Sequence, residues 1–188
     1  MKLIIPSVFI SLFLLFSGCA EKKKVIYIEN RGLCQSPATT LYIHDVTIEN
    51  NSKTFNISAN EIKLSLADSL SETNCYKVQL ADKDASSLEN ENEYVLNSKV
   101  SIFQDKEVVE ENIFKKEEKE RITLFIALTA NNNGKKVYAN AKSELLTDKS
   151  KILGVEKGVD AQGDKEMILK SATKKVSIAL TDGFSKLK

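Results

Sequence analysis

The sequence predicts an α+β fold in which two amphipathic helices pack on a single mixed or antiparallel β-sheet. Two observations lead to this fold class. Short runs of β-branched and aromatic residues, in which apolar and polar side chains alternate, recur along most of the chain and predict strands. Apolar residues at helical spacing occur in two segments, residues 58–73 and the region after Asp164, and each segment presents one apolar stripe to a sheet.

Three strands are expected in the first half of the chain. They cover residues 25–28, 41–48 and 76–80, which are rich in β-branched and aromatic side chains. The alternation in the second strand runs through Ile43 and resumes at Val46, which predicts one irregularity between these two residues.

The helix between the second and third strands has a clear beginning. Ser58 and Glu61 have the spacing of a capping box, in which each side chain accepts a hydrogen bond from the other residue's backbone. The apolar stripe that follows consists of Ile62, Leu66 and Leu70.

The second half of the chain predicts a meander of strands followed by the second helix. The strands cover residues 94–103, 122–130 and 137–146, with a hairpin turn at Gly134. Both sets of alternating side chains in residues 122–130 are largely apolar, which predicts a strand covered on both faces. The helix begins near Asp164, and its stripe consists of Ile168, Ala172, Val176, Ala179 or Leu180, and Phe184.

A charged block, residues 104–121, interrupts this pattern. Glu and Lys dominate it, and burying so many charges would be costly, so the block cannot enter a membrane. We expect either an exposed helix or the projecting end of a long hairpin. The candidate contact surfaces are this charged block and an exposed strand edge.

The N-terminus resembles a bacterial lipoprotein signal. Lys2 and an apolar run over residues 3–16 precede Phe16-Ser17-Gly18-Cys19, which is similar to a lipobox. The resemblance implies that residues 1–18 are a cleaved signal peptide and that Cys19 carries fatty acyl chains such as palmitate. Residues 19–24 are then the lipidated N-terminus and a short linker, and residues 25–188 form a single periplasmic α/β domain. The alternatives are an ordinary secretory signal and an uncleaved signal anchor.

The residues after Cys19 bear on localisation. By resemblance to enteric sorting signals, Ala20 favours the outer membrane over the inner membrane. The linker contains Lys22, Lys23 and Lys24 and is short, so the domain should stay close to the membrane. The sequence therefore predicts a domain held at the outer membrane and facing the periplasm, with display on the cell surface as the alternative.

Two cysteines remain beside Cys19, namely Cys34 and Cys75. In an exported protein, paired thiols tend to oxidise, so these two are expected to form a disulfide. The helix before Cys75 would run back along the sheet and bring it near the loop that contains Cys34.

Composition excludes several functions. The formal net charge is +1, which lacks the basic bias of a nucleic-acid binder. The single histidine, His44, lies in a predicted strand without a ligand cluster around it, so we predict neither a metal site nor a catalytic pair. No cofactor fingerprint or nucleophile motif occurs, and the chain is not expected to be an enzyme.

The element order resembles the small α/β domain of envelope lipoproteins such as CsgG, LpoB and the N-terminal domain of TolB, and also YajG-like lipoproteins. The residues that carry the likeness lie within 41–146, and the likeness in element order extends to the terminal helix. It rests on the pattern of strands and helices. It implies a domain that binds other envelope proteins or forms homo-oligomers, without catalytic residues. CsgG has apolar barrel hairpins and LpoB has a long tether, and both features are missing here.

These observations predict a lipid-anchored, non-enzymatic lipoprotein that scaffolds or assists assembly of a cell-envelope complex. The expected partners are the membrane, through the lipid on Cys19, and an envelope protein or further copies of the chain. One alternative is a carrier of a lipid or small apolar ligand, enclosed between the sheet and the helices. Another is a lipoprotein displayed on the cell surface.

Overall fold

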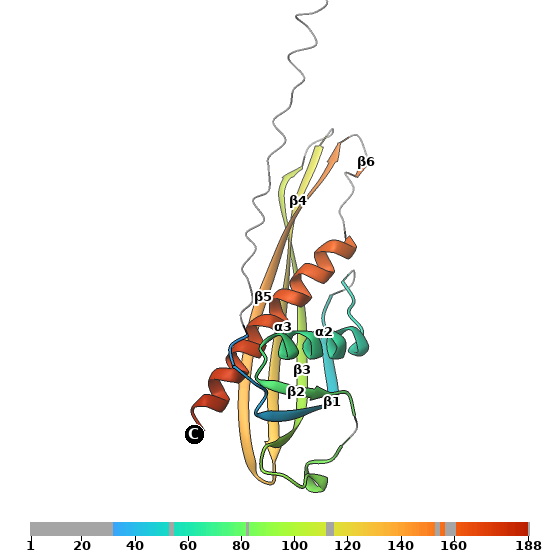
Figure 1. Cartoon of the computed structure of the whole chain (residues 1–188). Coiled ribbons are helices and arrows are strands. Elements are labelled where there is room, and N and C mark those ends of the chain that lie inside the picture. The colour runs from blue at the N-terminus through green and yellow to red at the C-terminus, as the bar shows by residue number, and fades with distance from the viewer. Residues whose placement is uncertain are drawn as a thin grey trace, which may run out of the picture.

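The computed structural model describes residues 32–52, 55–81, 83–111, 115–152, 155–156 and 161–187. They form one six-stranded sheet with two helices packed on one face (Figure 1). The elements are β1 (Thr39–Asn50), α2 (Ala59–Glu72), β2 (Tyr76–Gln79), the 3-10 turn η2 (Ala85–Ser87), β3 (Glu93–Glu111), β4 (Lys115–Asn132), β5 (Lys135–Ile152), β6 (Val155–Glu156) and α3 (Ala161–Ser185). The strand predicted at residues 25–28 lies outside the described residues.

The sheet is mixed, in the order β2-β1-β3-β4-β5-β6. β1 pairs in parallel with β2 on one side and with β3 on the other, whereas β3, β4, β5 and β6 pair antiparallel. Parallel neighbours need a crossover connection, which α2 provides between β1 and β2. The predicted α+β class with two helices on one sheet is confirmed.

The irregularity expected in β1 is a bulge. Ile43 pairs with Leu96, and the next pair is Val46 with Ser98. Between these two pairs β1 advances by three residues and β3 by two. An extra residue reverses which side chains face the core. Leu41 and Ile43 therefore point inward before the bulge and Val46 packs on the same core after it, while the polar residues between them stay off the core.

The capping box predicted for α2 is present. Ser58 Oγ accepts a hydrogen bond from the Glu61 backbone N–H at 3.2 Å, and Glu61 Oε2 accepts one from the Ser58 backbone N–H at 2.8 Å. Glu61 also pairs with Lys165 of α3, and this contact, followed by the Ser58 donors, lowers the pKa of Glu61 to about 2. The contribution of this network to stability is present at neutral pH and is lost as the pH falls from about 4 toward 2.

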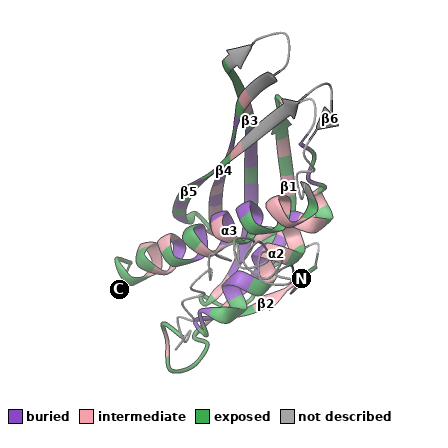
Figure 2. Cartoon of the chain, turned by 90° about the horizontal axis from the view of Figure 1, so that it is seen from above, coloured by how far each residue is buried: buried purple, intermediate pink, exposed green. Residues whose placement is uncertain are grey.

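The apolar stripes of both helices form the core with the inner face of the sheet (Figure 2). α3 begins at Ala161, slightly before the predicted start at Asp164. Its close approach to β5 requires Gly183, because a Cβ there would lie 2.7 Å from Cγ1 of Val137. The fully buried stripe residues are Ile62, Leu66, Leu70, Ala172, Val176 and Leu180, each 0% exposed.

The prediction that β4 is covered on both faces is wrong. Ile122, Leu124 and Ile126 face the helices and are buried, whereas Phe125 and Ala127 on the opposite, outer face are only half-buried. Apolar content on both sides of a strand indicates burial on both sides only when a second layer exists. Here the helices cover one face, and the loop containing η2 covers only the part of the outer face at Tyr42 and Val95.

Replacing Leu66 with Asp should unfold the domain, because it places an unpaired charge at a site that is 0% exposed. We expect a loss of at least about 3 kcal/mol in the free energy of unfolding. Leu64→Asp is the matched control, since Leu64 is on the same helix and is 47% exposed, and it should cost less than about 1 kcal/mol. Urea unfolding followed by circular dichroism measures both, and equal losses would contradict the assignment of the core.

Candidate functional site

The sheet extends well beyond the helices as an arm (Figure 1). The arm consists of three long strands, β3, β4 and β5, and the short β6 pairs with β5 at its tip. We define the arm as residues 103–111 of β3, 115–123 of β4 and 144–152 of β5. Strand pairing continues to its tip, where Glu111 pairs with Lys116 and Lys115 with Ile152. The charged block is therefore the projecting end of a long hairpin, and its alternative as an exposed helix is wrong.

The outer face of the arm carries apolar side chains close to its base. Phe103 is 45% exposed and Leu146 is 67% exposed, and Phe125 on the strand between them is half-buried. The register places all three on the outer face in successive rows, because Phe125 is opposite Lys142, Phe103 is opposite Thr123, and Leu146 is opposite Arg121. Thr123 and Arg121 of β4 lie between Leu146 and the two phenylalanines. We call Phe103, Phe125 and Leu146 the outer patch. Charged residues surround it, namely Asp105, Arg121, Lys142 and Glu144.

The expectation that the charges of this block stay exposed fails at one residue. The Glu120 side chain is 4% exposed and lies on the inner face at the base of the arm. It is stabilised there by Lys106, whose Nζ is 3.4 Å from Glu120 Oε1, and by a hydrogen bond from the amide of Gln104. Ser52 in turn bonds the side chain of Gln104. With these partners the buried carboxylate avoids the desolvation penalty of an isolated charge. Glu120 lies at the boundary between the apolar core and the arm.

The disulfide between Cys34 and Cys75 is present at the opposite end of the sheet. The S–S distance is 2.02 Å and the two Cα atoms are 5.0 Å apart. The residues between α2 and β2 hold the Cys34 loop in place, since the Cys34 N–H donates to the Thr73 carbonyl at 3.2 Å and Asn74 Nδ2 donates to the Cys34 carbonyl at 2.9 Å. This is the arrangement expected from α2 running back along the sheet.

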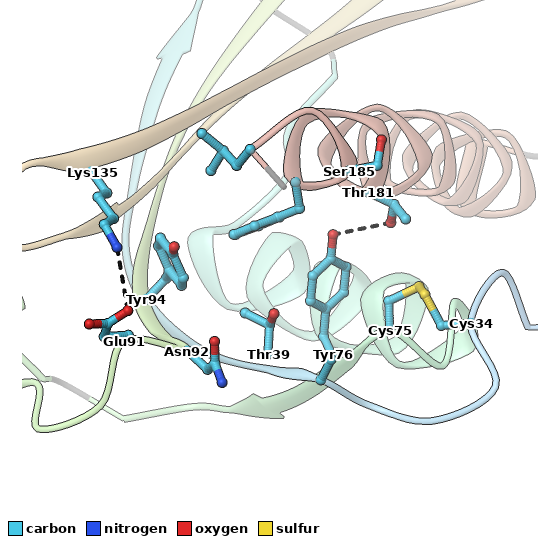
Figure 3. A pocket seen from close by; sticks show the side chains of 13 residues that line it. Cys34, Thr39, Cys75, Tyr76, Glu91, Asn92, Tyr94, Lys135, Thr181 and Ser185 are labelled. Carbon is cyan, nitrogen blue, oxygen red and sulfur yellow. Dashed lines mark hydrogen bonds and ion pairs between the residues drawn. A yellow bond between two sulfur atoms is a disulfide. The ribbon is translucent and has the colours of Figure 1, made fainter.

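A cavity of about 460 Å³ lies next to this disulfide (Figure 3). Aromatic rings from three elements line it, namely Tyr76 of β2, Tyr94 of β3 and Phe184 of α3. The ring centroid of Phe184 is 5.7 Å from that of Tyr76 and 4.9 Å from that of Tyr94, at interplanar angles of 56° and 84°. Polar side chains complete the lining, among them Thr39, Asn92, Thr181 and Ser185.

Hydrogen bonds and charges define the chemistry of this aromatic cavity. The Tyr76 hydroxyl donates to Thr181 Oγ1 at 3.1 Å. Burial raises the pKa of Tyr76 to about 12, and the nearby charge of Asp182 acts in the same direction, so the phenol stays neutral. At the rim, Lys135 Nζ lies 3.6 Å from Glu91 Oε2, and both side chains are mostly exposed.

Sequence reasoning missed the aromatic cavity. Tyr76 and Tyr94 lie at or next to the first residue of their strands, and Phe184 ends the stripe of α3. Each residue alone is typical of a strand or a helix face. They meet because β2 and β3 both run parallel to β1 and begin at the same end of the sheet, where α3 ends.

The remaining predicted residues are placed as follows. Cys19 lies outside the described residues. The His44 side chain is 26% exposed, and its Nδ1 is 3.1 Å from Asp45 Oδ2. In the described part of the chain there is no group of three His, Cys, Asp or Glu residues that could hold a metal ion. No helix found among those residues is long and apolar enough to cross a membrane.

Comparison with known proteins shows similarity in structure alone. No family model and no curated protein matches the chain. A putative neuraminyllactose-binding hemagglutinin homolog from Helicobacter pylori matches at 17% identity and a TM-score of 0.46, covering 81% of this chain and 90% of its own. Lipoprotein GNA1162 from Neisseria meningitidis matches at 12% identity and a TM-score of 0.38, and the match covers 74% of this chain and 99% of that protein. A minor lipoprotein from Acinetobacter baumannii matches at 12% identity and a TM-score of 0.36, and the match covers 78% of this chain and 94% of that protein. These similar structures include lipoproteins. Because their sequence identities and TM-scores are low, the similarity assigns neither a family nor a function to this chain.

The disulfide should contribute substantially to stability. It joins residues 41 positions apart. Closing a loop of that length lowers the conformational entropy of the unfolded chain, which stabilises the folded state by about 3 to 4.5 kcal/mol. We expect the double variant Cys34→Ser, Cys75→Ser to lose stability on that scale in urea unfolding. Non-reducing peptide mapping of the exported protein should recover the two cysteines in one linked peptide pair, and recovery of both as free thiols would contradict the prediction.

Proposed function

We propose that this chain is a lipid-anchored, non-enzymatic lipoprotein of the outer membrane that scaffolds a cell-envelope complex by binding a protein partner through its arm. The observation that carries the proposal is the outer patch on a projecting arm. The proposal has three supports: the place where the chain enters the domain, the composition of the outer patch, and the packing between sheet and helices.

The chain enters the domain at the end opposite the arm tip. Gly32 lies against Asn74, beside the disulfide and close to where β1 and β2 begin. It is 13 residues after Cys19, a stretch that reaches at most about 45 Å when fully extended. β3 is 19 residues long and rises about 3.3 Å per residue, so it spans about 60 Å. A domain anchored through Cys19 would therefore be attached at one end and would present the arm at the other, facing the periplasm.

The outer patch has the anatomy of a protein interface. It contains Phe103 and Leu146, which are largely open to solvent, and charges of both signs lie around and between its apolar side chains. Aromatic centres with polar rims are typical of protein–protein contacts. Exposed apolar side chains that gather in one place, rather than singly, mark such sites.

The packing of the described residues favours a scaffold over a carrier. A carrier of the kind considered above would enclose its ligand between the sheet and the helices. In the described part of the chain, one continuous core of buried side chains fills that space, including Leu66, Leu124 and Val176, which are all 0% exposed. The aromatic cavity lies outside this layer, at the end of the sheet.

The lipid anchor has a direct test. Labelled palmitate should enter the protein in its native host and should be absent from the Cys19→Ser variant, because the cysteine thiol is the acylation site implied by the lipobox. The protein should fractionate with the outer membrane. A wild-type protein that takes up no label and fractionates as soluble would contradict the anchor.

The partner surface is tested by Leu146→Asp. A carboxylate in place of the most exposed apolar side chain of the outer patch should reduce crosslinking to the partner in intact envelopes at least tenfold, since docking would have to desolvate the new charge. Tyr138→Asp is the matched control: Tyr138 is on β5 too, occupies the outer face, and is 65% exposed against 67% for Leu146. Both variants should melt like the wild type.

The proposal would be wrong if Leu146→Asp and Tyr138→Asp retained the same crosslinked species as the wild type. An equal loss of crosslinking in both variants would indicate that the interface lies nearer the anchored end of β5. Protease treatment of whole cells distinguishes a domain in the periplasm from one displayed on the surface, because only the latter would be digested.

A further inference from the structure

We propose that residues 25–29 pair antiparallel with residues 77–81 and so add a strand to the open edge of β2. The docked segment belongs to the stretch between the predicted lipidation site and the domain, and it lies outside the described residues. The inference is independent of the arm and of the partner proposed for it. It rests on three observations: the direction in which the chain enters the domain, the exposed apolar side chains at β2, and the match between the two segments.

β2 can accept a second neighbour. It has only four residues, and among the described strands β1 alone pairs with it, on one side. The other side of an edge strand presents backbone N–H and C=O groups that can pair with an extended segment. A segment of the same chain is favoured over a separate protein when it is tethered a few residues away, because its effective concentration at the edge is then high.

The entering chain already runs antiparallel to the residues that precede β2. The Cys34 N–H donates to the Thr73 carbonyl at 3.2 Å. Gly32, two residues earlier in the chain, lies against Asn74, which is one residue later than Thr73. Followed toward the N-terminus, the entering chain therefore moves along its neighbour in the direction of β2. Continued from Gly32, this direction leads the preceding segment along the open edge.

The apolar side chains of the two segments match in this register. In an antiparallel ladder one strand advances by a residue as the other recedes by one, which places Ile28 opposite Val78 and Ile26 opposite Leu80. Val78 is half-buried against the core, and Leu80, two residues later and so on the same face, is 54% exposed. Directly opposite side chains contact each other, so the two isoleucines would cover apolar surface that the described residues leave open.

The polar and conformational preferences of the segment agree with this placement. The same register puts Glu29 opposite Lys77, whose side chain is exposed. Opposite charges directly across a strand pair stabilise the pair. Residues 25–28 are all β-branched or aromatic, and such residues favour strands.

Docking of this strand would shorten the tether to the membrane. The 13 residues from Cys19 to Gly32 reach about 45 Å when fully extended. With Val25 fixed on the domain, the tether is the six residues from Cys19 to Val25, which reach about 20 Å. The edge of β2 would then lie close to the lipid head groups, within reach of the lysines at 22–24. This consequence rests on the proposed lipid anchor, whereas the docking itself does not.

Backbone hydrogen exchange of the purified full-length protein in detergent tests the docking. The amides of residues 25–28 should exchange on average at least tenfold more slowly than those of residues 20–24, because strand pairing protects N–H groups. Leu80→Asp should abolish this protection, because it places a charge opposite Ile26. Leu64→Asp is the matched control, since Leu64 lies on α2 and is 47% exposed against 54% for Leu80, and it should leave the protection unchanged.

A charge exchange tests the register. Glu29→Lys places like charges opposite each other and should reduce the protection of residues 25–28 about threefold. The double variant Glu29→Lys, Lys77→Glu brings opposite charges together again and should restore it. Cys19→Ser should show the protection of the wild type, because the docking needs no lipid. A protein that takes up no palmitate but protects residues 25–28 would therefore contradict the anchor and support the docking.

Three results would overturn the inference. One is exchange of residues 25–28 at the same rate as residues 20–24. Another is protection that survives Leu80→Asp, which would place the segment elsewhere on the domain. The third is a failure of the charge exchange, in which Glu29→Lys leaves the protection unchanged or the added Lys77→Glu does not restore it.

Discussion

Most of this structure depends on one mismatch, between a long sheet and a short helical layer that covers only one of its faces. The 25 residues of α3 span about 37 Å at the rise of an α-helix, whereas the 19 residues of β3 span about 60 Å. Where the helices lie, the inner face of the sheet is a dry core. Beyond them the strands continue as an arm, and the buried Glu120 with Lys106 marks the boundary. The outer patch is exposed for the same reason, since no second layer of described residues covers Phe103 and Leu146.

The two ends of the molecule are therefore chemically different. The end where the chain enters is constrained by a disulfide, by hydrogen bonds from Asn74 and by the aromatic cavity. The arm end is stabilised by strand pairing, and the buried side chains among its described residues lie near its base, namely Glu120, Ile122 and Leu145. This division is compatible with the proposed role, in which the constrained end lies near the lipid anchor and the outer patch at the base of the arm contacts a partner. Local stability should follow the same division, because the arm has less core to protect its backbone from opening.

The disulfide and the aromatic cavity are linked through β2. This strand has only four residues and lies at the edge of the sheet, where β1 is its single neighbour among the described strands. Such a short edge strand gains little from pairing alone. Cys75 directly precedes Tyr76, so the bond to Cys34 fixes the start of β2 and, with it, one aromatic wall of the cavity. Reduction of the disulfide would loosen that wall before it affected the core between sheet and helices.

The sequence by itself determined the features that depend on neighbours along the chain. Helical spacing and the Ser58–Glu61 box located α2, and alternation located β1, β2 and the parts of β3, β4 and β5 outside the arm. Even the bulge after Ile43 left a visible break in that alternation. Tertiary structure alone decided which residues meet across the sheet. Only the packing showed that β4 is covered on one face, that Glu120 is buried, and that Tyr76, Tyr94 and Phe184 share a cavity. Burial and site geometry depend on the order and direction of strands distant in sequence, and a local pattern carries no record of that order.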